Sequence, residues 1–72
     1  MNGWKKIMSL GDKYKAEIKR LQLLKNGIEA MVQEKTKQQE AVRLAMPGAD
    51  LYVKEGQYEI ANILLIENDD DN

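Results

Sequence analysis

The sequence predicts an all-α protein, a helical hairpin in which a long first helix is followed by a shorter second helix. Two observations carry this prediction. Apolar residues recur at helical spacing over about thirty-five residues, and Pro47-Gly48 then ends the pattern before a second apolar segment begins. Because the second helix is too short to cover the first, we expect two chains to pair as a homodimer, a four-helix assembly with coiled-coil packing.

The chain divides into three parts on this interpretation. We assign residues 1–9 to a flexible N-terminal segment, residues 10–67 to the helical hairpin and residues 68–72 to a disordered acidic tail. The chain has no cysteine and no histidine, so neither a disulfide nor a zinc site of the usual kind is available to stabilise so small a core. Self-association or binding to a larger protein is the remaining route to stability.

The first helix is predicted to begin at a capping box, Ser9-Leu10-Gly11-Asp12, in which the Ser9 hydroxyl accepts from an early helical N–H. Gly27 interrupts the helical pattern at a cost of about 1 kcal/mol relative to alanine, which a long helix can absorb. The polar residues 33–40 are mostly good helix formers, and we expect the helix to continue to Met46. A break near residues 35–37, which would give two helices, is the alternative.

The second helix is predicted over residues 51–67, with Asp50 as its N-cap. The alternative is a C-terminal β-hairpin after the long helix, turning at Glu55-Gly56 and placing Val53 opposite Tyr58. We favour the helix, because Glu-Gly is a poor substitute for Asn-Gly in such a turn. The continuous apolar run over residues 63–66 also extends past the matching strand.

One apolar stripe on the first helix is left without a cover in this arrangement, and we predict that it forms a protein interface. Trp4 is added as a hydrophobic anchor near the N-terminus. The predicted interface residues are Trp4, Tyr14, Ile18, Leu21, Leu24 and Ile28. A second copy of the chain is the favoured occupant, a larger protein is the next, and a compact monomer is the remaining alternative.

Catalysis and cofactor binding are not expected. General acid–base and nucleophilic catalysis most often use His, Cys or paired carboxylates in a pocket, whereas the acidic residues here are dispersed among lysines at helical spacing. The glycines are isolated, so no phosphate-binding loop is present, and the run of three aspartates over residues 69–71 lacks the spacing of a calcium loop. We predict no enzyme activity, cofactor, metal or small-molecule substrate.

Charge divides the chain at Pro47. Ten Lys or Arg against five Asp or Glu precede it, a balance of +5, and one Lys against seven acids follows from it onward, a balance of −6. The basic first helix makes a nucleic-acid-binding regulatory protein the alternative function. Its cations spread around the helix and the second half is acidic, which argues against that alternative; they are Lys5, Lys6, Lys13, Lys15, Lys19, Arg20 and Lys25.

Membrane attachment is also disfavoured. The segment from Trp4 to Leu10 has an interfacial aromatic residue and two lysines, but it is short and carries no lipidation signal. With no signal peptide and no cysteine, we expect a cytoplasmic protein. The sequence therefore predicts a small non-enzymatic protein-interaction module that acts by oligomerisation and by binding a larger protein, as an adaptor, assembly factor or inhibitor. The acidic second segment is another candidate for the working part, since it would present a negative surface to a basic groove on a nucleic-acid-binding target; its acidic residues are Asp50, Glu55, Glu59, Glu67 and the terminal aspartates.

Overall fold

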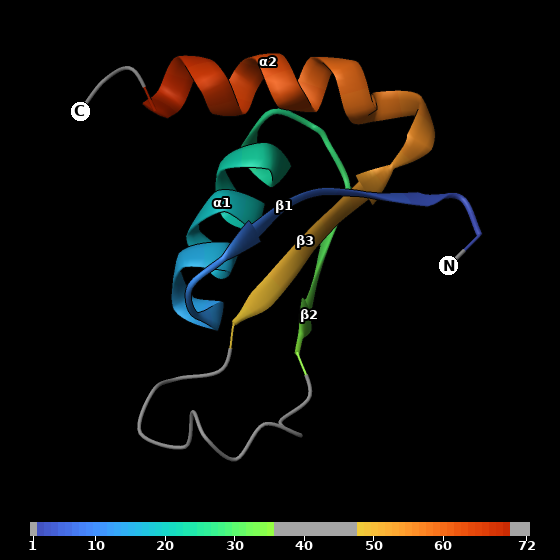
Figure 1. Ribbon diagram of the computed structural model, residues 1–72. Helices are drawn as coiled ribbons and strands as arrows, with labels where there is room; N and C mark the ends of the chain where they lie inside the picture. Colours follow the sequence, from blue (N-terminus) through green and yellow to red (C-terminus); the bar gives the residue numbers. More distant parts are fainter. Residues whose placement is uncertain (1, 36–47, 70–72) are drawn as a thin grey trace.

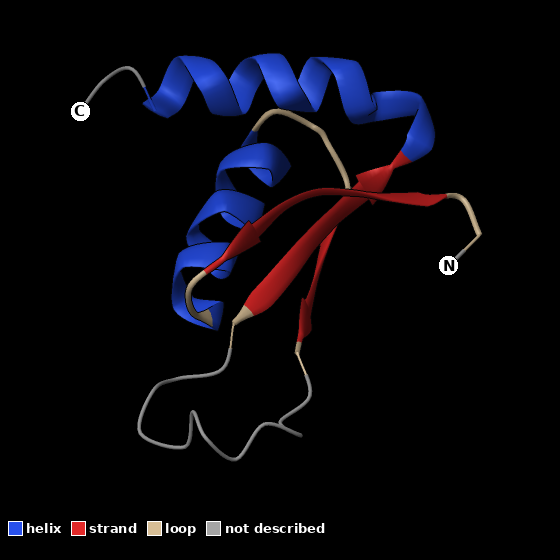
Figure 2. Ribbon diagram, viewed as in Figure 1, coloured by secondary structure: helices blue, strands red, loops and turns tan. Residues whose placement is uncertain are grey.

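The computed structural model describes residues 2–35 and 48–69. Over these residues the chain forms an α+β fold, a three-stranded antiparallel sheet with two helices (Figures 1 and 2). The elements in chain order are β1 (Trp4–Leu10), α1 (Lys13–Lys25), β2 (Ala30–Glu34), β3 (Ala49–Lys54), the 3-10 turn η2 (Glu55–Gln57) and α2 (Tyr58–Asp69). Figure 1 shows β1 passing in front of α1, and α2 crossing the top of the molecule.

The all-α prediction, with its helical hairpin and coiled coil, is therefore wrong. The first helix ends at Lys25, and residues 30–34 form a strand. The second helix begins at Tyr58, because residues 49–54 form β3. The alternative C-terminal hairpin is wrong too, since β3 pairs with β1 and β2. The predicted helix over residues 36–46 and the end of the acidic tail, residues 70–72, lie outside the described residues.

β3 is the central strand, and the sheet order is β1-β3-β2. Leu51 of β3 lies opposite Met8 of β1 and Val32 of β2, and both pairings are antiparallel. β1 and β2 are therefore parallel to each other and are joined through α1, which is the arrangement of a split β-α-β unit. The register of β1 shifts between Lys6 and Met8, so that strand carries a bulge. Most of residues 1–9, which the sequence places outside the folded hairpin, belong to β1.

The core lies between one face of this sheet and the two helices. Alternate residues of β3 are buried, as expected for a strand with one covered face, and both helices supply apolar side chains to the same cluster. The fully buried core cluster consists of Leu23, Ile28, Leu51, Val53, Ala61 and Leu65. The opposite face of the sheet carries the other set of β3 residues, which are half-buried: Asp50, Tyr52 and Lys54.

The ends of α1 are set by two local motifs. At the start, the Asp12 carboxylate accepts a hydrogen bond from the Lys15 backbone N–H at 2.9 Å, so Asp12 is the N-cap. The predicted Ser9 capping box is wrong, because Ser9 belongs to β1 and its hydroxyl donates to Asp50 at 2.7 Å. At the other end, Gly27 adopts a φ of +80° and its N–H donates to the Leu24 carbonyl at 2.9 Å. This is a glycine C-cap, and it turns the chain toward β2.

The turn after α1 is also tied to η2, which directly precedes α2. The side-chain amide of Gln57 donates to the Gly27 carbonyl at 3.3 Å and accepts from the Glu29 N–H at 3.1 Å. One side chain thus satisfies two backbone groups of the turn between α1 and β2. These contacts fix the C-terminal end of α1 relative to the N-terminal end of α2.

Candidate protein interface

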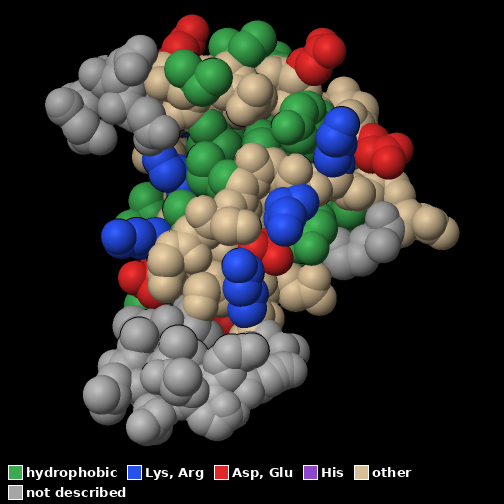
Figure 3. Space-filling view, in the orientation of Figure 1, with side chains coloured by type: hydrophobic (Ala, Val, Ile, Leu, Met, Phe, Trp, Pro, Cys, Tyr) green, Lys and Arg blue, Asp and Glu red, His purple; other side chains and the backbone are tan. Residues whose placement is uncertain are grey.

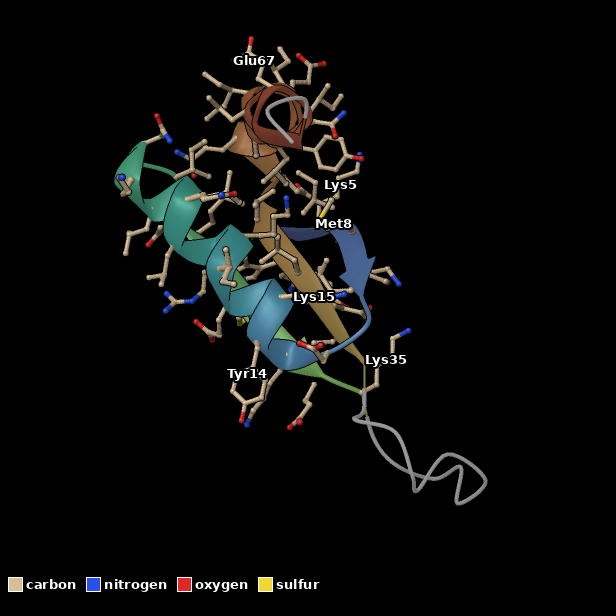
Figure 4. The ribbon with its side chains drawn as sticks, turned by 90° about the vertical axis from the view of Figure 1, so that its left-hand side faces the viewer. Lys5, Met8, Tyr14, Lys15, Lys35 and Glu67 are labelled. Carbon is tan, nitrogen blue, oxygen red and sulfur yellow. The ribbon has the colours of Figure 1, made fainter. Side chains whose placement is uncertain are left out.

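α1 carries large apolar side chains on the side that faces away from the sheet. We call this surface the α1 outer face and define it by four residues whose exposed fractions run from 49% to 61%. They are Tyr14, Ile18, Leu21 and Leu24. Figure 4 shows the Tyr14 side chain projecting away from the body of the molecule. The structure thus brings together four of the six residues that the sequence predicts as an interface.

The helix geometry explains why these side chains remain exposed. Residues two apart on an α-helix lie about 200° apart around its axis, since 3.6 residues make one turn. Leu23 has an exposed fraction of 0% and points into the core, so Leu21 points outward. In the same way, buried Ala16 directs Ile18 outward. The α1 outer face therefore lies opposite the side of the helix that packs on the sheet, and nothing in the described part of the chain covers it.

The α1 outer face is surrounded by positive charge. Lys25 is four residues after Leu21 and seven after Ile18, so it extends the same face by one turn. The Lys13 ammonium lies 5.8 Å from the centre of the Tyr14 ring. Along the whole helix, five Lys or Arg and one Glu give a formal charge of +4. Glu17 is paired with Arg20, at 2.9 Å.

The other two predicted interface residues lie elsewhere. Ile28 is 2% exposed and is part of the core, just after the turn that ends α1. Trp4 is half-buried in β1, where the Lys54 ammonium lies 4.7 Å from the centre of its ring. Trp4 therefore belongs to the face of the sheet that the helices do not cover. Neither residue extends the α1 outer face.

α2 has a second exposed apolar surface, which is not among the predicted interface residues. We call it the α2 outer face, and its three isoleucines are 54% to 55% exposed: Ile60, Ile63 and Ile66. Ile63 is two residues from both Ala61 and Leu65, which are buried, so it points directly away from the core. The spacing of three residues between successive isoleucines was the available signal.

The α2 outer face is acidic. α2 contains Glu59, Glu67 and Asp69 and no Lys or Arg, a formal charge of −3. Figure 4 shows Glu67 projecting from the top of the molecule, and Figure 3 shows acidic and hydrophobic side chains side by side along this edge. Because α1 runs along one side of the molecule and α2 crosses its top, the two outer faces point in different directions (Figure 1).

The outer edges of the sheet are less suited to association. β1 has a bulge between Lys6 and Met8, and lysines at positions 5 and 6 add charge to this edge. β2 is only five residues long and ends in Gln33-Glu34. Bulges, charges and short strands are the usual means by which edge strands avoid pairing with other chains. The helical faces are therefore the better candidates for an interface.

A metal site and a membrane-spanning helix find no support in the described residues. Within residues 2–35 and 48–69, no group of three or more acidic, His or Cys side chains is placed to hold a metal ion. Among the helices that the structure describes, none combines the length and the apolar character needed to cross a bilayer. Comparison with protein-family models, with curated proteins and with solved structures finds no match for this chain.

Proposed function

We propose that this protein is a non-enzymatic interaction module that self-associates through its helices. The α1 outer face of one copy packs on the α2 outer face of another copy. The observation that carries the proposal is the position of four large apolar side chains, each 49% to 61% exposed, opposite the buried side of α1. Exposed apolar surface of this kind on a small protein is typical of a binding surface.

Charge favours unlike faces as partners. The helix that carries the α1 outer face has a formal charge of +4, and the helix that carries the α2 outer face has a formal charge of −3. Two α1 faces would repel each other, as would two α2 faces, whereas α1 against α2 pairs opposite charges around an apolar centre. Since the two faces point in different directions, each copy contacts two different neighbours, and the association is head to tail.

A head-to-tail assembly leaves one α1 outer face open at one end, unless it closes into a ring. A larger protein that carries an acidic amphipathic helix, chemically similar to α2, would bind there. This supports the role of an adaptor or assembly factor that joins copies of itself to a target. The absence of cysteine from the sequence is consistent with the cytoplasm as its compartment.

The test is a complementation experiment with two variants. Ile18→Asp places a charge in the α1 outer face, and Ile63→Asp does the same in the α2 outer face. Each variant alone should be monomeric, because every contact needs one intact face of each kind. A mixture should form a complex of two chains, in which intact α1 of the Ile63→Asp chain binds intact α2 of the Ile18→Asp chain. Molar mass by light scattering after size exclusion, over a tenfold concentration range, gives the result.

The conservative variants Ile18→Leu and Ile63→Leu are the controls, and both should associate as the unmodified protein does. Loss of one central apolar contact at an interface costs about 2 kcal/mol or more, which weakens the dissociation constant by roughly thirtyfold. If the Ile63→Asp variant alone is dimeric and the Ile18→Asp variant alone is monomeric, the α1 outer face binds another α1 outer face instead. An unmodified protein that stays monomeric at every concentration would refute self-association.

A further inference from the structure

The face of the sheet that the helices leave uncovered has a composition of its own. Its positions on β3 alternate with the buried residues Leu51 and Val53, and the register of β1 places Trp4 opposite Lys54 and Lys6 opposite Tyr52. We call this surface the open sheet face. Its defining residues are Trp4, Lys6, Lys35, Asp50, Tyr52 and Lys54.

The register places two aromatic residues at diagonal positions on this face. Trp4 is opposite Lys54, and Tyr52 is two residues before Lys54 on the same side of β3. Trp4 and Tyr52 are therefore diagonal neighbours, which in antiparallel sheets lie about 7–8 Å apart. Both are half-buried, so part of each side chain remains open to solvent. Flat aromatic side chains on an open sheet are the surface on which unpaired bases stack.

Three lysines lie on the same face, Lys6 from β1, Lys54 from β3 and Lys35 from the position directly after β2. Lys6 and Lys35 each place an ammonium group 3.8 Å from a carboxylate oxygen of Asp50, and both lysine side chains are 51% exposed. Lys54 lies over the Trp4 ring at 4.7 Å. Three lysines against one aspartate give this face a net charge of +2. Figure 3 shows lysine side chains next to acidic ones over the strands in the middle of the molecule.

Asp50 keeps the lysines in place without neutralising them. Its carboxylate is only 15% exposed and accepts a hydrogen bond from the Ser9 hydroxyl at 2.7 Å, so it is fixed in the sheet. The two lysine side chains beside it are each 51% exposed, so a second anion can reach them. The acidic residues of the α2 outer face, Glu59 and Glu67, belong to another surface and do not compete for these lysines.

We propose that the open sheet face binds single-stranded nucleic acid, with phosphates at Lys6 and Lys35 and bases stacked on Trp4 and Tyr52. The bases of a paired duplex are stacked on each other and cannot reach these rings. An acidic peptide could pair with the lysines but has no bases to stack on Trp4 and Tyr52. The objection that the cations spread around one helix does not apply to this face. The relevant cations are not spread around one helix, because Lys6, Lys35 and Lys54 come together on the sheet.

Trp4 provides a direct probe, because it is the only tryptophan in the chain. Oligo(dT) and oligo(rU) of about twelve nucleotides match the length that such surfaces cover. Titration of either strand into the full-length protein at low salt should quench the Trp4 fluorescence. Contacts to two or three phosphates should make the affinity fall with salt, with a slope of about −1.4 to −2 in a plot of log K against log salt.

Two matched pairs of variants locate the site. The double variant Lys6→Gln/Lys35→Gln removes two phosphate contacts and should weaken oligonucleotide binding by about tenfold or more. Tyr52→Leu removes a stacking surface and should weaken binding by a similar factor. Lys13→Gln with Lys25→Gln removes the same charge from α1 and should leave binding unchanged. Circular dichroism confirms that each variant is folded. If the α1 pair loses binding and the sheet pair keeps it, the basic first helix is the binding element and the open sheet face is not.

Three other results would overturn the proposal. No quenching by either strand at low salt would mean that the face does not bind nucleic acid. Tighter binding of a DNA duplex than of either single strand would rule out base stacking. Equal binding of inorganic polyphosphate, which has no bases, would show that only charge is recognised. This site is separate from the two helical outer faces, so the Ile18→Asp and Ile63→Asp variants should bind the oligonucleotides as the unmodified protein does.

Discussion

Leu23 and Ile28 join the end of α1 to the core: the backbone N–H of Ile28 donates to the Leu23 carbonyl at 3.0 Å, and both side chains are buried. Gly27, between them, adopts a φ of +80°. This hydrogen bond and the one from the Gly27 N–H to the Leu24 carbonyl form a Schellman motif, in which the residue after the glycine packs back on the last turn of the helix. This motif ends the helix and directs the chain into β2.

Gly27→Ala should therefore destabilise the protein. A residue with a Cβ in the left-handed region costs about 1–2 kcal/mol, and the free energy of unfolding should fall by that amount in urea titrations followed by circular dichroism. Gly11→Ala is the control, since no heavy atom lies within 4 Å of its added Cβ and its φ is outside the left-handed region. Equal losses for the two variants would show that the turn at Gly27 does not depend on glycine.

Leu21 and Leu23 offer a second comparison, because they are two residues apart on α1 and point in opposite directions. Leu23→Ala leaves a cavity in the core and should lower the free energy of unfolding by about 2–5 kcal/mol. Leu21→Ala removes an exposed side chain and should change it by about 0.5 kcal/mol or less. Urea unfolding at a protein concentration below that of self-association separates the two. A larger loss for Leu21→Ala would mean that the opposite side of α1 packs on the sheet.

The same two residues show why the sequence predicted part of the candidate site but not the fold. Helical periodicity correctly placed Tyr14, Ile18 and Leu21 on one face of a helix. It did not show which side of that helix is buried, because Ala16 and Leu23 form a smaller apolar set opposite them. Burial is decided by packing on the sheet, whose central strand β3 begins 24 residues after α1 ends. The interface itself stays a prediction.

The strands were missed for local reasons. Asn26-Gly27 is a helix-ending signal. The prediction of a long helix instead treats Gly27 as an interruption that the helix can absorb. In residues 49–54, apolar and polar residues alternate, which is the period of a strand with one buried face. The prediction used Asp50 as a helix cap instead, whereas Asp50 pairs with Lys6 of β1 and with Lys35, directly after β2. The second helix was correct only from Tyr58 onward, after β3 and η2.

The start of α1 supplies a third prediction. Asp12→Ala removes the carboxylate that accepts from the Lys15 N–H, and the free energy of unfolding should fall by about 1 kcal/mol. Asp12→Asn should retain most of the stability, since asparagine is an equally good cap. Ser9→Ala, which tests the capping box expected from the sequence, should not affect the helix. Hydrogen exchange of the first-turn amides reports on fraying, and faster exchange in Ser9→Ala but not in Asp12→Ala would reverse the assignment.

Asp50→Asn supplies the fourth prediction, and it separates stability from binding. The ion pairs of Asp50 with Lys6 and Lys35, both at 3.8 Å, involve half-exposed lysines, and such pairs contribute about 0–1 kcal/mol. The variant should therefore unfold at nearly the same urea concentration. The open sheet face would gain one net positive charge, and oligo(dT) should bind about fivefold more tightly, which corresponds to roughly 1 kcal/mol for unit charges 4 Å apart in water. Trp4 fluorescence titration measures the change.

Asp12→Asn is the control, because it changes the net charge by the same amount at the start of α1 and should leave the affinity for oligo(dT) unchanged. Weaker binding by Asp50→Asn would argue against phosphate contacts at Lys6 and Lys35.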